Sequence, residues 1–268
     1  MTLGPIIQAE EINMAFYIIS HEDEKFTAVA DRLKTALKLD GKLPCYRINI
    51  TPENCPEEIP SWWTAMPDRW ALCCAIREAL CLAIENDEDC ELYEQDAVFC
   101  EDFKEKRLAF LSALPDDWDM AYLGGQLLAS NFYPLQEVKE NDQVLLCKNA
   151  HRNHAWICRR SSIPRLLEWL EGEKWPCKHT TDWRIGYLQM KDDFKVYIPK
   201  NGWLAGQGAG LSTLDKVETP ERWWHFTEKE RAQEIERWRE FETARKEAAE
   251  KARYEAWKAE MEKRSRGE

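Results

Sequence analysis

Three consecutive residues, Glu94-Gln95-Asp96, place two carboxylates at the end of an apolar stretch typical of a buried strand. Residues two positions apart on a strand point to the same face, so we expect the carboxylates of Glu94 and Asp96 to lie side by side. Burying both is costly unless a cation or basic groups offset their charge. A hard divalent cation such as Mn²⁺ or Mg²⁺ takes one or two carboxylates and leaves sites for phosphate oxygens. The triplet is a candidate metal site or, in the simpler interpretation, an exposed strand end.

The elements that would position this triplet alternate between strand and helix. Apolar or alternating runs predict strands at 15–20, 46–50, 90–99 and 118–123, and helices at 24–39, 68–86 and 103–114. This order predicts an α/β fold with a mainly parallel sheet and helices on both faces. Ligands bind beyond the carboxyl ends of the strands in such sheets. Ser20 and His21 follow the first strand and are therefore expected beside a bound nucleotide base and ribose.

The second half is less regular. It predicts strands at 143–147, 154–158 and 194–198, helices at 164–170 and 182–188, and a glycine-rich loop at 201–210. Residues 227–268 read as one long charged helix with a thin apolar stripe. We expect one domain over 1–226 and this helix as a separate element. The helix either packs loosely on the body or serves docking and self-association.

The net charge of -12 on 268 residues is unevenly distributed. Residues 227–268 are balanced in acids and bases, so the acidic excess lies in 1–226. An acidic body disfavours broad nucleic-acid binding, which needs phosphate neutralisation, and it suits either a cation held by carboxylates or a solvated surface.

The ten cysteines include no Cys-x-x-Cys pair and no zinc-ligand spacing. They predict reduced, mostly structural thiols and a reducing compartment. No apolar run approaches the roughly 20 residues of a membrane span, and the N-terminus has no signal-peptide pattern. These features predict a cytoplasmic protein without a membrane partner.

The order of motifs resembles glycosyltransferase family 25, which includes lipopolysaccharide-modifying and collagen galactosyltransferases. In that family a helix precedes a strand ending Glu-Asp-Asp, and Leu-Pro-x-x-Trp-Asp and a strand ending Leu-Gly follow. The matching segments here are 68–96, 114–119 and 122–124, with weaker similarity at 154–159, 181–183, 197–199 and 207–212. Coverage extends over about residues 15–215 and implies a GT-A type fold. The match is to a divergent, phage-like branch, because Gln95 replaces the middle acid and Cys73-Cys74 stands where the family often has Ser-His.

The resemblance implies sugar transfer from a nucleotide-sugar, chiefly a UDP-sugar, to an acceptor hydroxyl, with Mn²⁺ or Mg²⁺ acting on the diphosphate. Asp96 would be a metal ligand, and Glu94 would bind the metal or the donor ribose. A histidine of the later half would be the third ligand, since neutral imidazole suits Mn²⁺. His225 is our choice, with His154 and His179 as alternatives.

Further roles follow from the same resemblance. Asp182 is the candidate base for the acceptor hydroxyl, unless it only caps the following helix. Gln207, Gly208 and Ser212 belong to a loop whose backbone N–H groups would close over the diphosphate, or to an ordinary turn. Trp203, Trp223 and Trp224 would form an acceptor platform or fill the core.

The acceptor stays open: a lipopolysaccharide sugar, a protein hydroxyl or a hydroxymethylated base in phage DNA would suit the fold. DNA would need a basic patch, for which Arg159, Arg160, Arg165 and 174–178 are candidates if they are not solvated surface. The alternative to an enzyme is a non-catalytic, glycosyltransferase-like binding or scaffold protein. A nucleotide-binding hydrolase is disfavoured because no phosphate-binding loop lysine is present.

Overall fold

The computed structural model describes residues 15–127, 136–139, 141–148, 150–174, 180–211 and 218–224, together with 243, 247 and 250–258. The chain divides into two compact units, residues 1–224 and 225–268. In the second unit residues 250–258 are helical, and Tyr254 and Trp257 are 59% and 58% exposed. The rest of the helix predicted over 227–268 lies almost entirely outside the described residues.

The body is built on an eight-stranded sheet. Its strands stand in the order β2 (Cys45–Ile48), β1 (Phe16–Ile19), β3 (Cys90–Glu94), β8 (Ala150–Cys158), β5 (Met120–Leu127), β9 (Val196–Pro199), β7 (Val144–Cys147), β6 (Gln136–Glu137). β1 is parallel to β2 and β3, and β5 is parallel to β9. β8 runs antiparallel between β3 and β5, and β7 runs antiparallel to β9 and β6. The sheet is thus mixed, and the prediction of a mainly parallel sheet is wrong because a strand of the second half enters its centre.

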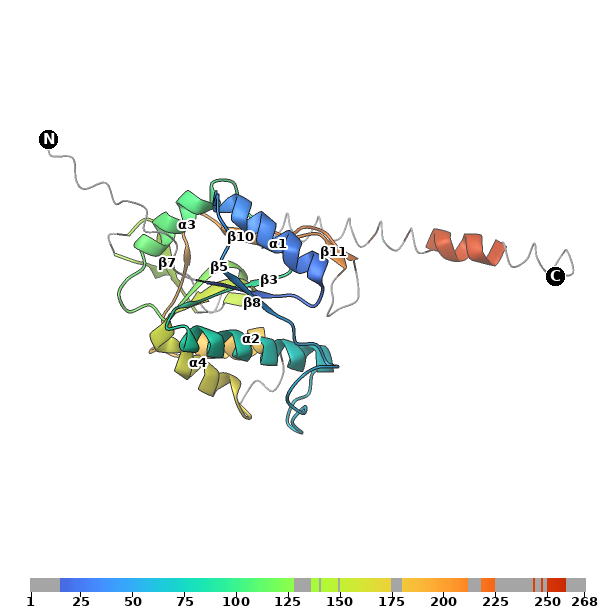
Figure 1. Cartoon of the computed structure of the whole chain (residues 1–268), viewed down its shortest axis with the longest axis horizontal. Coiled ribbons are helices and arrows are strands. Elements are labelled where there is room, and N and C mark those ends of the chain that lie inside the picture. The colour runs from blue at the N-terminus through green and yellow to red at the C-terminus, as the bar shows by residue number, and fades with distance from the viewer. Residues whose placement is uncertain are drawn as a thin grey trace, which may run out of the picture. The chain divides into compact units, whose positions relative to one another are not determined.

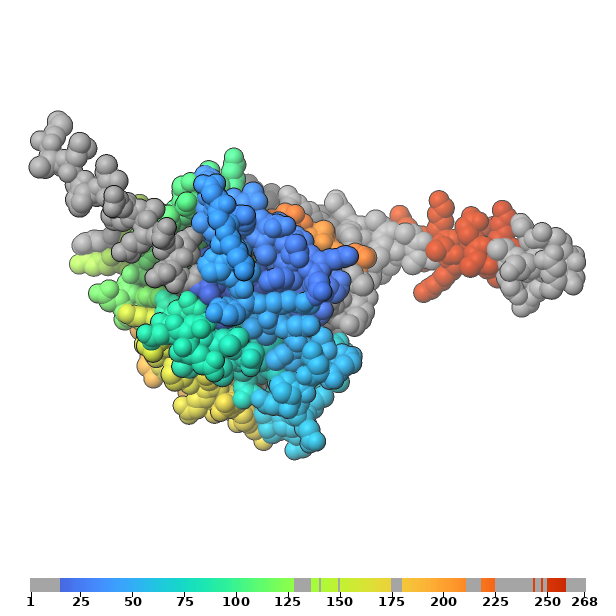
Figure 2. Space-filling view, viewed as in Figure 1, coloured from blue at the N-terminus to red at the C-terminus, as the bar shows by residue number. Residues whose placement is uncertain are grey.

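Helices cover both faces of this sheet, as predicted. α1 (Asp23–Ala36) and α3 (Phe103–Ser112) lie on one face, and α2 (Pro67–Glu85) and α4 (Ile163–Leu170) on the other (Figure 1). The short η1 (Arg160–Ser162) leads into α4, and α5 (Thr181–Gln189) packs on α4 and β8. In the space-filling view the first half of the chain, blue to green, covers most of the visible face of the body, with the yellow α4 below it (Figure 2).

Helix ends follow from local sequence. α1 begins with Asp23 and Glu24 and has Lys34 in its last turn, which matches the helix dipole at both ends. α2 begins at Pro67, whose fixed backbone angle suits a first helical position. The ends of α1 and the start of α2 are therefore determined by their local sequences.

The core between the sheet and the α1–α3 layer contains an ion pair. Apolar side chains of β1, β3, α1 and α3 form this core, among them Phe16, Val29 and Phe110. Within it Arg107 of α3 donates from Nε to Glu91 Oε1 of β3 at 2.9 Å, and Nη2 pairs with the other carboxylate oxygen. The Tyr93 hydroxyl also donates to Glu91. A charged bond therefore fixes α3 on the strand that leads to the acidic triplet.

The predicted strand over 90–99 is interrupted at the triplet. β3 ends at Glu94, a turn follows, and β4 (Ala97–Phe99) leaves the main sheet to pair antiparallel with β10 (Ala205–Gln207). β11 (Gly210–Leu211) pairs with β12 (Glu218–Thr219). The predicted loop 201–210 is therefore partly strand, and it reaches the triplet through β4.

Gly124 allows the close approach of β10 to β5. A Cβ at this position would lie 2.3 Å from the Ala205 carbonyl oxygen and 2.7 Å from His154 Nε2. We expect Gly124→Ala to lower the free energy of unfolding by about 1–3 kcal/mol, because backbone must move. Gly41→Ala is the matched control, since its Cβ would meet nothing within 4 Å. Urea denaturation measures both, and equal stability of the two variants would contradict the close contact.

The nine described cysteines fit the prediction of reduced, mostly structural thiols. All nine of them are free thiols, and five are buried. Among the described residues, no helix is both long and apolar enough to cross a bilayer.

Candidate functional site

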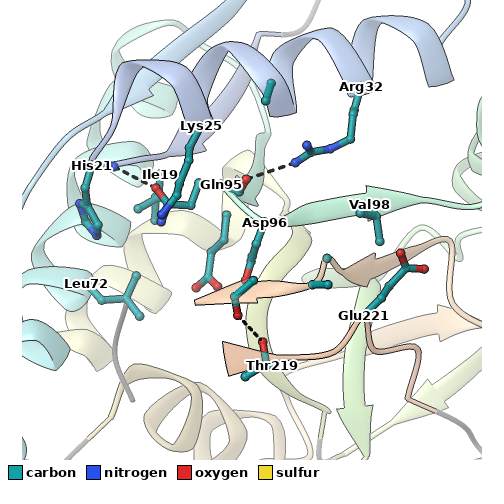
Figure 3. Close-up of a pocket in the computed structure, with 15 residues that line it drawn as sticks. Ile19, His21, Lys25, Arg32, Leu72, Gln95, Asp96, Val98, Thr219 and Glu221 are labelled. Carbon is teal, nitrogen blue, oxygen red and sulfur yellow. Dashed lines mark hydrogen bonds between the residues drawn. The ribbon is translucent and has the colours of Figure 1, made fainter. Parts of the chain in front are cut away.

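A pocket of about 310 Å³ opens where β1 and β3 end (Figure 3). It lies between α1, the turn after β3 and the residues around β11 and β12. It is lined by Ile19, His21, Lys25, Ala28, Arg32, Leu72, Glu94, Gln95, Asp96, Val98, Gly208, Ala209, Gly210, Thr219 and Glu221. Its position beyond the carboxyl ends of parallel strands is where the sequence predicts a ligand.

Asp96 is held by the segment around β10. Its Oδ2 accepts a hydrogen bond from Gln207 Nε2 at 2.7 Å, and its backbone carbonyl accepts one from the Gly208 N–H at 2.6 Å. A Cβ on Gly208 would lie 3.0 Å from that carbonyl, so the approach depends on a small residue. Gln207 and Gly208 therefore position Asp96, and the Gly208 N–H expected to reach a diphosphate is already occupied.

Two carboxyl groups line the pocket, Glu94 from the last residue of β3 and Asp96 from the turn that follows. Burial raises the pKa of Asp96. Burial, with repulsion from Asp96 and Asp182, raises the pKa of Glu94 to about 8. Asp96 Oδ1 is buried and accepts no hydrogen bond from the described residues. A carboxylate oxygen without a donor, beside a second carboxyl group, fits a hard divalent cation that draws its other ligands from water or phosphate.

The third metal ligand predicted from the sequence, His225, stays a prediction. The described residues contain no cluster of three or more His, Cys, Asp or Glu suited to a metal. His225, His179 and Ser212 lie outside the described residues. His154 is 1% exposed, with its ring 5.4 Å from that of Trp224, and burial lowers its pKa to about 3.

Gln95 links the ends of β1 and β3. Its Oε1 accepts hydrogen bonds from Ser20 Oγ and from the His21 backbone N–H, both at 3.1 Å. Ser20 is fully buried and supports the pocket wall from behind. An amide accepts both bonds without adding a third negative charge to the floor, which gives a physical reason for Gln at the middle position of the triplet.

Sequence reasoning missed the wall formed by α1. Lys25 and Arg32 extend from this helix toward the turn after β3 (Figure 3). Arg32 donates to the backbone carbonyls of Ala97 and Gln95 at 3.1 and 3.2 Å. Beside them, burial lowers the pKa of His21, which favours its neutral form. Lys25, Ala28 and Arg32 stand three and four residues apart, a helical spacing that could have revealed this face.

Two further polar side chains, Asp182 and Arg152, lie near the starts of α5 and β8. Asp182 is half-buried in the first turn of α5, and its charge acts on both Glu94 and His151. Arg152 has φ 78°, donates from Nε to Gln126 Oε1 at 3.1 Å and stacks 5.1 Å from the Trp224 ring. Asp182 lies inside the helix, where it accepts from its neighbour's backbone N–H. Thr180 occupies the N-cap position, but Asp182 accepts a first-turn N–H that has no partner within the helix, so the capping interpretation is confirmed in part.

The tryptophans expected as an acceptor platform are mostly in the core. Trp203 and Trp224 are 7% and 8% exposed, so their rings offer no open face. Trp223 is half-buried and packs where a Cβ on Gly206 would lie. These positions confirm the core-filling alternative for Trp203 and Trp224.

Three of the basic residues considered for DNA are paired with acidic or carbonyl groups, whereas residues 175–178 of the candidate patch lie outside the described residues. Arg160 forms an ion pair with Asp87, and Arg165 with Asp193 at 2.6 Å. Arg159 donates to a backbone carbonyl. Pairing removes much of the positive potential that phosphate binding needs.

The raised pKa of Glu94 predicts a pH dependence of stability. Between its unfolded value of about 4.5 and about 8, the folded state holds a proton that the unfolded state has lost, so stability falls as pH rises. Burial lowers the pKa of His151 to about 4, which acts in the opposite sense below about 6.5. Between pH 6.5 and 8 we expect the free energy of unfolding of the wild type to fall by up to about 1.4 kcal/mol per pH unit because of Glu94. The Glu94→Gln variant should lack this fall. Urea unfolding across this range tests it, with Glu101→Gln as control. If the free energy of unfolding depended on pH in the same way in the wild type and in Glu94→Gln, the raised pKa of Glu94 would be contradicted.

Fold and site together define an α/β protein with an eight-stranded mixed sheet and a carboxylate-floored pocket at its strand ends. No protein-family model and no curated protein matches the chain. Among solved structures it is similar to the one described as "Crystal Structure of A197 from STIV", with 13% identity and a TM-score of 0.37. The match covers 80% of this chain and 97% of that chain. A similarity at this level carries no argument about activity, so function is argued from the site.

Proposed function

We propose that the protein is a metal-dependent glycosyltransferase that moves a sugar from a nucleotide-sugar, a UDP-sugar in the first place, to an acceptor hydroxyl. The observation that carries this proposal is the floor of the pocket, where Asp96 keeps one unpartnered carboxylate oxygen beside Glu94. Lys25 and Arg32 line the same pocket and would complement a diphosphate. Its volume lies at the lower end of the range for small-molecule sites. The GT-A type resemblance of the sequence supports the same class.

The carboxylates of Asp96 and Glu94 would hold Mn²⁺ or Mg²⁺, which would neutralise the charge that develops on the leaving diphosphate. Gln207 and Gly208 keep Asp96 in place for that task. His21, at the end of β1, would contact the base or ribose through a neutral ring.

Asp182 would act on the acceptor. The acceptor hydroxyl oxygen forms a bond to the anomeric carbon, and the bond from that carbon to the diphosphate oxygen breaks. The electron pair of the broken bond leaves with the nucleoside diphosphate, and the hydroxyl proton passes to the Asp182 carboxylate. Asp182 lies close enough to Glu94 for its charge to raise the pKa of that group, which supports a location near the donor pocket.

A donor screen tests the proposal. The full chain is titrated by calorimetry with UDP-glucose, UDP-galactose and UDP-N-acetylglucosamine, with Mn²⁺ and with EDTA, and UDP release is followed in parallel. We expect heat and UDP release with at least one donor, and both should require the cation. Two results would favour the non-catalytic binding protein. One is nucleotide-sugar binding that EDTA does not change. The other is binding without UDP release from any donor when mono- and disaccharide acceptors are supplied.

A further inference from the structure

An aromatic pair with one exposed ring lies outside the lining of the nucleotide pocket. Trp183 in the first turn of α5 is 43% exposed, and the ring of Tyr187, one turn later, lies 6.3 Å away at 37°. The His151 ring meets Trp183 edge-on, at 4.8 Å and 72°. His151 can lie this close to α5 because Gly186 has no side chain: a Cβ there would be 2.7 Å from His151 Nε2. The indole ring is therefore supported from one side and open to solvent on the other.

Two polar side chains, Asp182 and Arg152, are adjacent in sequence to Trp183 and to His151. Asp182 directly precedes Trp183, and its charge acts on His151, the residue that supports the indole. Arg152 follows His151 on β8, and its Nη atoms donate to no partner among the described residues. Its positive φ is strained for a residue with a side chain, and Gln126 and Trp224 fix the guanidinium from two directions. Strain of this kind at a fixed polar side chain is typical of a functional position.

We propose that Trp183 and Tyr187 form a stacking platform for a saccharide acceptor, with Asp182 accepting and Arg152 donating hydrogen bonds to its hydroxyls. The proposal rests on the proposed glycosyl transfer and specifies its acceptor. It moves the acceptor platform from Trp203 and Trp224, which the core encloses, to residues of α5.

The chemistry favours a saccharide over a nucleic acid. A sugar presents an apolar C–H face to an aromatic ring and hydroxyls to the groups around it. Asp182 adjoins Trp183, and the chain carries a net charge of -12, so phosphates would be repelled. The platform residues are absent from the lining of the nucleotide pocket, which leaves that pocket to the donor.

Fluorine NMR on the full chain labelled with 5-fluorotryptophan tests the platform directly. The Trp183 resonance is assigned by its loss in Trp183→Phe, and the Trp257 resonance, from a residue that is 58% exposed, serves as the internal control. The probes are methyl β-D-glucopyranoside, methyl β-D-galactopyranoside and a single-stranded octanucleotide. We expect a glycoside to shift Trp183 saturably while Trp257 stays in place, and Asp182→Asn and Arg152→Gln each to weaken this binding about five- to tenfold.

Two results would overturn the platform. One is a Trp183 resonance that moves no more than Trp257 with either glycoside, and the other is a response to the octanucleotide alone. Failure of the proposed transferase is separately visible, since it would appear as missing cation-dependent heat with nucleotide-sugars. A saturable glycoside shift without nucleotide-sugar binding would uphold the saccharide site and remove the transferase.

Discussion

Replacing Asp96 by Asn is expected to reduce nucleotide-sugar turnover about 10³-fold while the protein remains folded. The substitution keeps the shape of the side chain, and its amide oxygen can still accept from Gln207, so the position of the turn is preserved. It removes the charge on the buried, unpartnered Oδ1, which would be the main cation ligand of the proposed site. Loss of several kcal/mol of transition-state stabilisation corresponds to that reduction in rate.

The measurement is UDP release at saturating donor, with calorimetric titration of Mn²⁺ in the same samples. Glu101→Gln removes one negative charge from an exposed residue outside the pocket lining and serves as the matched control. We expect it to retain wild-type turnover. Turnover of Asp96→Asn within about threefold of the control would exclude Asp96 as the cation ligand, whatever the denaturation curves show.

Arg107→Met is expected to cause the largest loss of stability. The change leaves the Glu91 carboxylate, which is fully buried, without its cation. Removing one partner of a buried pair costs about 3–5 kcal/mol, because the remaining charge is neither solvated nor paired. For a chain of this size that corresponds to a fall in Tm of about 10 °C. Thermal denaturation followed by circular dichroism measures it.

The double variant Glu91→Leu with Arg107→Met is the decisive comparison. It removes both charges, and we expect it to recover most of the stability lost in the single variant. Lys38→Met breaks the exposed pair with Glu105 and is expected to leave Tm unchanged. A double variant as unstable as Arg107→Met would show that packing, and not the unpaired charge, accounts for the loss.

The sequence predicts those parts of the fold that depend on local pattern. Each strand and helix expected before residue 127 is present, because periodicity and helix-end residues report directly on local structure. The pairing of β8 between β3 and β5 was beyond reach, since strand order depends on contacts between distant segments. The interruption at Gln95-Asp96 was missed for a related reason: β4 turns away to pair with β10, which the sequence did not mark as a strand.

The candidate site was predictable to a similar degree. Glu94 and Asp96 stood out because acidic residues at the end of an apolar strand contradict the local pattern. His21 reached the pocket as expected from the strand it follows. Arg32 and Arg152 did not stand out, since a charged residue on a helix or in a half-polar strand is common. Only the fold brings Arg32 to the turn and holds Arg152 in its positive φ.

The insertion of β8 has a consequence for how the chain folds. β3 lies between β1, which precedes it, and β8, whose Cys158 pairs with Cys90 across a long stretch of chain. During synthesis the first half emerges with one edge of β3 open, and the centre of the sheet closes only after residues 150–158 have left the ribosome. Pairing between strands so far apart in the sequence slows folding. Until β8 pairs with β3, the chain exposes an unpaired strand edge that is prone to aggregation. Glu91 lies on that open strand, and its pairing with Arg107 is local enough to form before β8 arrives.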